Sequence, residues 1–144
     1  MSAEDDYAPS PTGWVREQVE AIDAAGDTNA VELRGLPVVL VTMRGAKSGK
    51  LRKVPLMRVE HEGRYAAVAS QGGRPDNPKW YANLVASPDV ELLDGTTRTP
   101  MRARELEGHE RYEWWVRAVE AYPLYAEYQV KTQRQIPVFV LEPR

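Results

Sequence analysis

The sequence predicts an α+β domain built on a mostly antiparallel split β-barrel, and three observations lead to this prediction. Short apolar runs of strand length are joined by tight-turn signals, above all Glu62-Gly63 and Asp94-Gly95. Helical patterns are inserted late and do not alternate with strands, which argues against a βαβ sheet. A chain of 144 residues with 42% hydrophobic content suffices for one core. We expect one domain, in which residues 1–32 form a tail and helix and residues 33–144 form the cofactor-binding barrel.

The first expected elements are an acidic N-terminal tail and a helix. Residues 1–10 are small and acidic, which predicts a mobile segment. Ser10-Pro11-Thr12 is a helix start signal, and Gly26-Asp27 ends the helix. The inward face of this helix is expected to carry Trp14, Val15, Val19 and Ile22.

Strands and two further helices are expected to follow. Apolar runs predict strands over residues 38–43, 54–61, 64–70, 90–93, 97–105 and 136–141. A short helix over 79–86 is closed by Ser87-Pro88. A longer helix over 109–122 is expected to face inward with Tyr112, Trp115, Val116 and Val119.

Composition excludes several classes of site. Without cysteine there are no disulfides, thiolate metal sites or cysteine nucleophiles, and two separated histidines argue against a metal centre or a Ser-His-Asp triad. A net charge of -2 argues against a nucleic-acid partner, and no apolar run is long enough for a membrane span. We expect a cytoplasmic protein with a small-molecule partner. It should be a monomer, with a dimer and peripheral membrane association as alternatives.

The most unusual stretch is a basic loop, residues 44–53, in which five of ten residues are Lys or Arg. Two glycines allow a tight turn whose N–H groups can point at an anion, and the cations add charge. The spacing is not that of a nucleotide-binding P-loop, because Leu51 replaces the hydroxyl residue and Pro55 favours extended backbone downstream. An anion cradle and a solvated basic hairpin loop remain about equally supported by these residues.

A second constellation is formed by Tyr122, Tyr125 and Tyr128, which share one face at helical or 3₁₀ spacing. Simple packing of amphipathic rings is one explanation; a wall for a flat aromatic ligand, with phenols that donate to a developing anion, is the other. Ser70 closes a strand before exposed backbone donors, and Trp80 and Asn83 share one side of a short helix. Together with the basic loop, these residues describe a site with a charged end and a flat aromatic end.

Taken together, the motifs resemble one family. The resemblance rests on Gly45-Ala46-Lys47-Ser48-Gly49-Lys50-Leu51-Arg52, Pro55-Leu56, Val68-Ala69-Ser70-Gln71-Gly72-Gly73, Pro78-Lys79-Trp80-Tyr81-Ala82-Asn83-Leu84, Pro88 and Tyr122-Pro123-Leu124-Tyr125. In order and spacing these resemble the deazaflavin-dependent nitroreductase family, actinobacterial split-barrel enzymes of the flavin/deazaflavin oxidoreductase group A. The resemblance extends from about Leu33 to Pro143.

This resemblance implies a reductase that binds coenzyme F-420, an 8-hydroxy-5-deazaflavin, and transfers a hydride to an electron-poor acceptor. By position in the motifs, the cofactor contacts would be Lys47, Ser48, Gly49 and Arg52 at the anionic tail, Pro55, Leu56, Val68, Ala69, Ser70 and Gln71 at the ring, and Trp80 and Asn83 on the helix that holds it. Ser70, Tyr122, Tyr125 and Tyr128 are the catalytic candidates. The substrate pocket would be formed by Met57, Tyr122, Leu124, Tyr125 and Tyr128, and no metal is required.

The chain departs from the family pattern at Ala46, Met57 and Leu124, which bears on substrate choice more than on cofactor binding. Quinones and lactone-containing aromatics such as coumarins and aflatoxins are therefore expected as acceptors ahead of nitroimidazoles. The alternatives are an FMN-dependent oxidoreductase of the same fold, a non-catalytic deazaflavin carrier and, last, a nucleic-acid-binding domain. The five cations of the basic loop favour the polyanionic tail of F-420 over the shorter phosphate of FMN.

Overall fold

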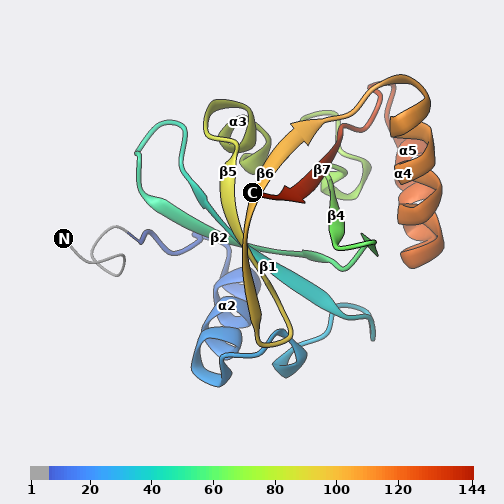
Figure 1. The fold of residues 1–144 in the computed structure, drawn as a ribbon. Coiled ribbons are helices and arrows are strands. Elements are labelled where there is room, and N and C mark those ends of the chain that lie inside the picture. Colours follow the sequence, from blue (N-terminus) through green and yellow to red (C-terminus); the bar gives the residue numbers. More distant parts are fainter. Residues whose placement is uncertain (1–6) are drawn as a thin grey trace.

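The computed structural model describes residues 7–144, so the first six residues of the expected N-terminal tail lie outside the described part of the chain. Seven strands form one sheet in the order β2-β1-β5-β6-β7-β4-β3, and each neighbouring pair is antiparallel (Figure 1). The strands are β1 (Val38–Arg44), β2 (Leu51–Met57), β3 (Glu60–His61), β4 (Arg64–Val68), β5 (Asp89–Asp94), β6 (Thr97–Glu105) and β7 (Val138–Pro143). The predicted α+β class with a mostly antiparallel barrel is confirmed.

Within residues 7–144, four α-helices and two short 3₁₀ segments flank the sheet. They are α2 (Gly13–Ala25), η1 (Thr28–Ala30), η2 (Gln71–Gly73), α3 (Trp80–Ala86), α4 (Gly108–Ala121) and α5 (Leu124–Lys131). The three helices expected from the sequence are present at nearly the expected positions. The tyrosine spacing beyond Tyr122 proves to be that of α5, a separate helix that begins after Pro123.

The curled sheet is joined across its two sides at one end only. The N–H of Ala66 on β4 donates to the carbonyl of Val59, just beyond β2, at 2.9 Å. At the opposite end, near the Gly45–Lys50 turn, β2 and β4 are not hydrogen-bonded neighbours. The barrel is therefore split, and its open end lies beside the basic loop, α3 and η2, whereas the β5–β6 hairpin lies at the other end (Figure 1).

Strand alternation divides the buried side chains between two faces. On β4, Tyr65 and Ala67 belong to the cluster inside the barrel, whereas Ala66 and Val68 belong to the cluster beneath α4 and α5. A third cluster is formed where Val19 and Ile22 of α2 pack on β1. The expected tyrosine face of residues 122–128 thus lies against the second of these clusters.

The two hairpin turns differ in detail. At Glu62 and Gly63, φ is 52° and 78°, which is typical of a type I′ turn. The second turn is one residue later than expected, because Asp94 pairs with Thr97 inside the ladder and leaves Gly95 and Thr96 as the two turn residues. Gly95 has φ 60° at the first turn position, as in a type II′ turn, and this register leaves the Asp94 side chain free to reach other strands.

Some expected boundaries and inward faces are wrong. The run over 54–61 begins earlier and divides into β2 and β3, and Trp14 of α2 is 54% exposed. On α4, Tyr112 and Val116 are exposed, whereas Trp114 and Ala118 are buried. Trp115 and Val119 of the expected face are partly buried against the same cluster, so that face is only partly turned outward. The Trp114 ring contacts the guanidinium groups of Arg64 and Arg117.

Within residues 7–144, no helix is long and apolar enough to cross a membrane.

Candidate functional site

The basic loop is a compact turn closed by its own main chain. The N–H of Gly45 donates to the carbonyl of Lys50 at 2.7 Å, and the N–H of Gly49 donates to the carbonyl of Gly45 at 3.0 Å. A side chain at Gly45 would lie only 2.9 Å from the Ser48 hydroxyl and 3.2 Å from the Lys50 carbonyl. The sequence therefore needs glycine at position 45 to fold this turn tightly.

The loop presents unpaired positive charge. Lys47 and Lys50 are exposed, and neither ammonium group has an ion-pair partner among residues 7–144. The N–H groups of Lys47 and Ser48 donate no hydrogen bond to that same part of the chain. Exposed cations together with unbonded amides fit a phosphate or carboxylate ligand.

Two other predicted contacts in this loop are already engaged. The Ser48 hydroxyl accepts from the Lys50 N–H at 3.1 Å. Arg52 donates through Nη1 to the carbonyls of Ala8 and Pro9 at 3.2 and 3.1 Å, where the N-terminal segment runs beside β2. The carbonyl of Gly49 accepts from Nη1 of Arg44 at 2.7 Å. Of the four residues expected at an anionic tail, Lys47 is thus the one whose side chain has no hydrogen-bond partner among the described residues.

Asn83 and Trp80, both on α3, have different partners. The Asn83 Oδ1 accepts from the N–H of Ala46 at 2.8 Å, and its amide nitrogen lies 3.7 Å from the Met43 sulfur. Trp80 is half-buried against the core inside the barrel, with its ring centroid 6.4 Å from that of Phe139. Asn83 therefore holds the loop in place, whereas Trp80 packs on the core.

The expected ring-lining residues of β2 and β4 differ in their accessibility. Leu56 and Pro55 are half-buried, and Leu56 packs on the core inside the barrel. Met57, Val68 and Ala69 are buried, and both main-chain polar groups of Ala69 are bonded within the protein. Ser70 is 8% exposed, and its hydroxyl has no partner among the described residues. The Ser70 hydroxyl is therefore the polar side-chain group of this set that a ligand can still engage.

The tyrosine triad is more deeply packed than a pocket wall would require. Tyr122 and Tyr125 are buried, Tyr128 is half-buried, and their rings meet edge to face with centroids 4.9–6.3 Å apart. The hydroxyls of Tyr122 and Tyr128 are hydrogen-bonded at 2.9 Å. Leu124, at the start of α5, is half-buried against the same cluster. Of the predicted catalytic tyrosines, Tyr128 is thus the one with an accessible side chain.

Burial raises the pKa of the Tyr122 and Tyr125 phenols. Desolvation, followed by the hydrogen bond to Tyr128, raises the pKa of Tyr122 to about 12. Burial also raises the pKa of Tyr125 well above its ordinary value. Both groups therefore remain hydrogen-bond donors in the neutral range.

Sequence reasoning missed Arg134, which lies in the connection between α5 and β7. It donates to the carbonyls of Ala69 and Ser70 at 3.1 and 2.9 Å, and to the Asn77 side chain at 2.8 Å. A single arginine in a polar stretch belongs to no periodic pattern and no motif, so no sequence signal could have identified Arg134 as part of the site. It ties the segment that contains Ser70 to the chain beyond α5.

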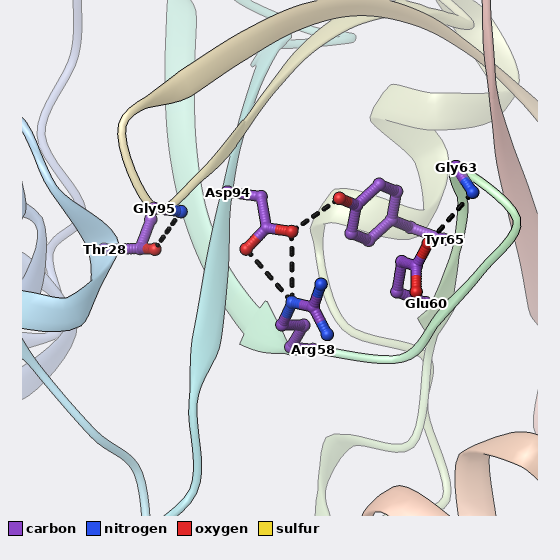
Figure 2. Close-up of polar contacts among 7 residues, drawn as sticks. All are labelled: Thr28, Arg58, Glu60, Gly63, Tyr65, Asp94 and Gly95. Carbon is purple, nitrogen blue, oxygen red and sulfur yellow. Dashed lines mark hydrogen bonds and ion pairs between the residues drawn. The ribbon is translucent and has the colours of Figure 1, made fainter.

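A second network that was not expected lies at the closed end of the barrel (Figure 2). Nε of Arg58 donates to the two Asp94 oxygens at 3.1 and 3.0 Å, and the Tyr65 hydroxyl donates to Oδ2 at 2.5 Å. Burial and the Asp94 carboxylate raise the pKa of Tyr65 to about 12. Hydrogen bonds from Arg58 and Tyr65 lower the pKa of Asp94 despite its partial burial. This network joins β4, β5 and the end of β2, away from the basic loop.

A hollow of about 800 Å³ lies between α4 and the β2–β3 connection, outside the predicted site. Its lining mixes both charge signs: Arg58, His61 and Arg117 with Glu60, Glu113 and Glu120. Within the described chain no three His, Cys, Asp or Glu side chains gather as metal ligands. The chemistry suited to an anionic ligand is therefore at the open end of the barrel, where the basic loop, α3 and the Ser70 segment are found.

Comparison with known proteins gives consistent findings over most of the chain. The family described as F420H(2)-dependent quinone reductase matches residues 14–143. A putative F420H(2)-dependent quinone reductase of Mycobacterium tuberculosis (strain ATCC 25618 / H37Rv) is 38% identical over 109 residues, which cover 76% of this chain and 92% of that relative.

Two solved structures are also similar. One, described as an F420-H2 dependent reductase, has a TM-score of 0.70 and 61% identity, and the match covers 73% of this chain and 93% of that one. The other, described as a domain-swapped dimer, has a TM-score of 0.74 and 59% identity, and the match covers 92% of this chain and 100% of that one.

Proposed function

This chain belongs to the F420H(2)-dependent quinone reductase family, and from that premise we propose that it reduces quinones with reduced coenzyme F-420. Family membership confirms the deazaflavin-dependent reductase to which the sequence motifs pointed. The observation that carries the proposal is the basic loop, with two unpaired lysines and two unbonded amides beside the open end of the barrel. That combination suits the polyanionic tail of F-420.

At the anionic end, Lys47, Lys50 and the amides of Lys47 and Ser48 would hold the tail, and Gly49 would allow close approach of the main chain. Arg52 would join them by exchanging its bonds to the Ala8 and Pro9 carbonyls for the ligand. Asn83 would act indirectly, because it fixes the N–H of Ala46 and with it the shape of the loop.

At the ring end, Pro55 and Leu56 would supply an apolar wall, and the Ser70 hydroxyl would supply a hydrogen bond. Val68, Ala69 and Trp80 would support this wall from behind, since their side chains are packed into the protein. Gln71 follows Ser70 directly and would offer its main-chain N–H.

When bound, reduced F-420 supplies a hydride. A quinone that takes up this hydride also needs one proton to become the hydroquinone. We assign the proton donor to Tyr128, whose half-buried hydroxyl is hydrogen-bonded to Tyr122 at 2.9 Å. The raised pKa of Tyr122 keeps that partner protonated, so it can stabilise negative charge left on Tyr128. Ser70 would donate a hydrogen bond to the reacting pair, and water would return the proton to Tyr128.

The acceptor would lie beside the Ser70 hydroxyl and the accessible side of Tyr128. Met57, Tyr122, Leu124 and Tyr125 would shape this space from behind, because all four are buried or half-buried. An aromatic quinone suits such a wall, and coumarin- or aflatoxin-like lactones are the next acceptors to test. Nitroaromatics are the third class.

We retain the expectation of a cytoplasmic monomer. A dimer is the alternative supported by the solved relative described as domain-swapped. Light scattering on the purified protein decides between them: a mass near 16.3 kDa indicates a monomer, and twice that mass indicates a dimer.

The test is a fluorescence titration with oxidised F-420 and with FMN, followed by turnover of reduced F-420 with quinones. F-420-selective binding with quinone-dependent oxidation is expected. Lys47→Ala should weaken F-420 binding roughly tenfold, whereas Arg98→Ala, which removes a surface cation from the other end of the barrel, should leave it unchanged.

Tyr128→Phe should slow turnover by roughly 10²-fold while leaving F-420 affinity nearly intact. Equal rates in Tyr128→Phe and the parent protein would remove Tyr128 from the proton-transfer step. Binding without turnover on any acceptor would favour the carrier function, and stronger binding of FMN would favour the flavin alternative.

A further inference from the structure

The segment after β4 has an unusual backbone and a set of unused donors. Ser70 is in the right-handed helical region (φ -75°, ψ -39°), and Gln71 follows with φ 46°, a conformation that is rare for a residue with a side chain. Successive right- and left-handed residues turn consecutive N–H groups toward one point, which makes a small concavity for an anion. The N–H groups of Ser70, Gln71 and Gly72 donate to none of the described residues.

Arg134 holds the opposite side of the same peptide units. Its Nη1 and Nη2 donate to the carbonyls of Ala69 and Ser70, and its Nε donates to the carbonyl of Arg74 at 3.0 Å. The carbonyls of Ala69 and Ser70 belong to the peptide units whose nitrogens are those of Ser70 and Gln71. Charge-assisted hydrogen bonds to the oxygens polarise these units and strengthen the N–H groups as donors.

The guanidinium group of Arg134 has no carboxylate partner within residues 7–144. Its positive charge is therefore matched only by neutral carbonyls and the Asn77 side chain. An uncompensated cation behind the loop favours negative charge in front of it. This is a different arrangement from the basic loop, in which the cations themselves are exposed.

The loop is also locked to α5. A side chain at Gly73 would lie 2.7 Å from the Tyr128 carbonyl, and φ there is 83°. Gln129 of α5 accepts from the Ile136 N–H and donates to the Arg134 carbonyl at 2.8 Å, which fixes the connection that carries Arg134. Ser70 and Tyr128 are consequently held by one rigid unit.

We propose that Arg134 is a positioning residue that aims the main-chain N–H groups of Ser70, Gln71 and Gly72 at an oxygen atom of the reacting pair that carries or gains negative charge. This inference rests on the proposed function. The oxygen belongs either to the ring of the bound cofactor or to the quinone, and the two sources have different kinetic signatures. Loss of a cofactor contact weakens F-420 affinity, whereas loss of a quinone contact lowers kcat at unchanged F-420 affinity.

The variants are Arg134→Lys, which keeps the charge but not the planar fork, and Arg134→Met, which removes both. Arg144→Lys is the matched control, because Arg144 donates to the carbonyl of Met101 outside this segment. Hydrogen exchange is measured first on the cofactor-free protein. Amides of residues 69–77 should exchange at least about tenfold faster in both Arg134 variants, with the barrel strands unchanged.

F-420 affinity and quinone turnover are then measured on the same preparations. Both variants should lose roughly 10- to 100-fold in one of these two quantities, as expected for a misplaced contact. Full activity in Arg134→Lys would overturn the proposal, since a single ammonium group cannot serve these acceptors. Unchanged exchange of residues 69–77 would overturn it as well, and so would a general loss of thermal stability with normal kinetics per folded molecule.

If the parent protein failed to bind F-420 or to reduce quinones, the proposed function would fall. The exchange measurement would still decide whether Arg134 holds the segment, so the two failures are distinguishable. Normal exchange in the variants refutes the role of Arg134 whatever the parent protein binds.

Discussion

Replacing Asp94 by Asn tests how much the charged network at the closed end of the barrel contributes to folding. The substitution keeps the shape and volume of the side chain and removes its negative charge. The Asp94 carboxylate accepts both hydrogen bonds from Arg58 and the hydrogen bond from the Tyr65 hydroxyl (Figure 2). Asp94 lies within the β5 ladder, beside the turn, so no turn residue is altered. The change therefore isolates the electrostatic part of the contact.

The expected loss in the free energy of unfolding follows from the distance between Arg58 and Asp94 and from the exposure of their side chains. At 3.0 Å and an effective dielectric of about 20, the attraction between Arg58 and Asp94 is about 5 kcal/mol before desolvation. The side chains of Arg58 and Asp94 are 37% and 21% exposed, so solvent screening and the desolvation of Asp94 offset much of this. A net loss of about 2 kcal/mol is expected, which lowers Tm by about 6 °C in a chain of this size.

Urea and thermal unfolding monitored by circular dichroism measure this loss. Asp89→Asn is the control, because Asp89 contacts Arg102 at a similar 3.0 Å but both side chains are more than half exposed; it should cost under about 0.5 kcal/mol. Equal losses in the two variants would refute the argument that partial burial makes the Asp94 network strong.

The pH dependence of the same pair of proteins gives a second check. The Asp94 pKa is lowered in the folded state, so the charge contributes fully above the unfolded pKa of about 3.9. The advantage of the parent protein over Asp94→Asn should therefore shrink as the pH falls below that value. A difference that stayed constant down to pH 2 would contradict the lowered pKa.

Three further predictions concern other parts of the fold. Because the pKa of Tyr65 is raised to about 12, its contribution to stability is complete below about pH 10 and is lost between pH 10 and 12. Tyr65→Phe should therefore make the free energy of unfolding less dependent on pH over that range. An unchanged pH dependence in this variant would contradict the raised pKa. Gly73→Ala should lower the free energy of unfolding, measured in urea, by roughly 3 kcal/mol or more, because backbone strain adds to the clash with the Tyr128 carbonyl. Gly72→Ala is the control: φ is 65° but the space around it is open, so the loss should be about 1 kcal/mol. Asn83→Ala should weaken F-420 binding roughly fivefold, because the variant loses the hydrogen bond to the Ala46 N–H. Fluorescence titration measures this affinity. Equal affinity in the variant and the parent protein would show that the loop keeps its shape without this side chain.

The sequence alone determined the features that depend on neighbours along the chain. Apolar runs and turn residues predicted the strands and both hairpins, because a strand and its tight turn are specified within a few residues. Gly45 and Gly49 predicted a tight turn in the basic loop, and its main-chain hydrogen bonds confirm that turn. The motifs around Lys47, Ser70 and Trp80 indicated the deazaflavin-dependent family that the comparisons support.

Tertiary structure decided everything that depends on which elements meet. Periodicity could not choose between neighbouring faces of α4: in the structure Trp114 and Ala118 are fully buried, whereas Trp115 and Val119 of the expected face are only partly buried beside them. Asn83, expected at the cofactor, holds the basic loop, and Arg52 is bonded to the N-terminal segment. The partners of the Arg134 side chain are 57 to 65 residues away in sequence. Asp94 of β5 contacts Tyr65 on β4 and Arg58 just after β2. Contacts over such separations exist only once the sheet has curled, so no local pattern of residues encodes them.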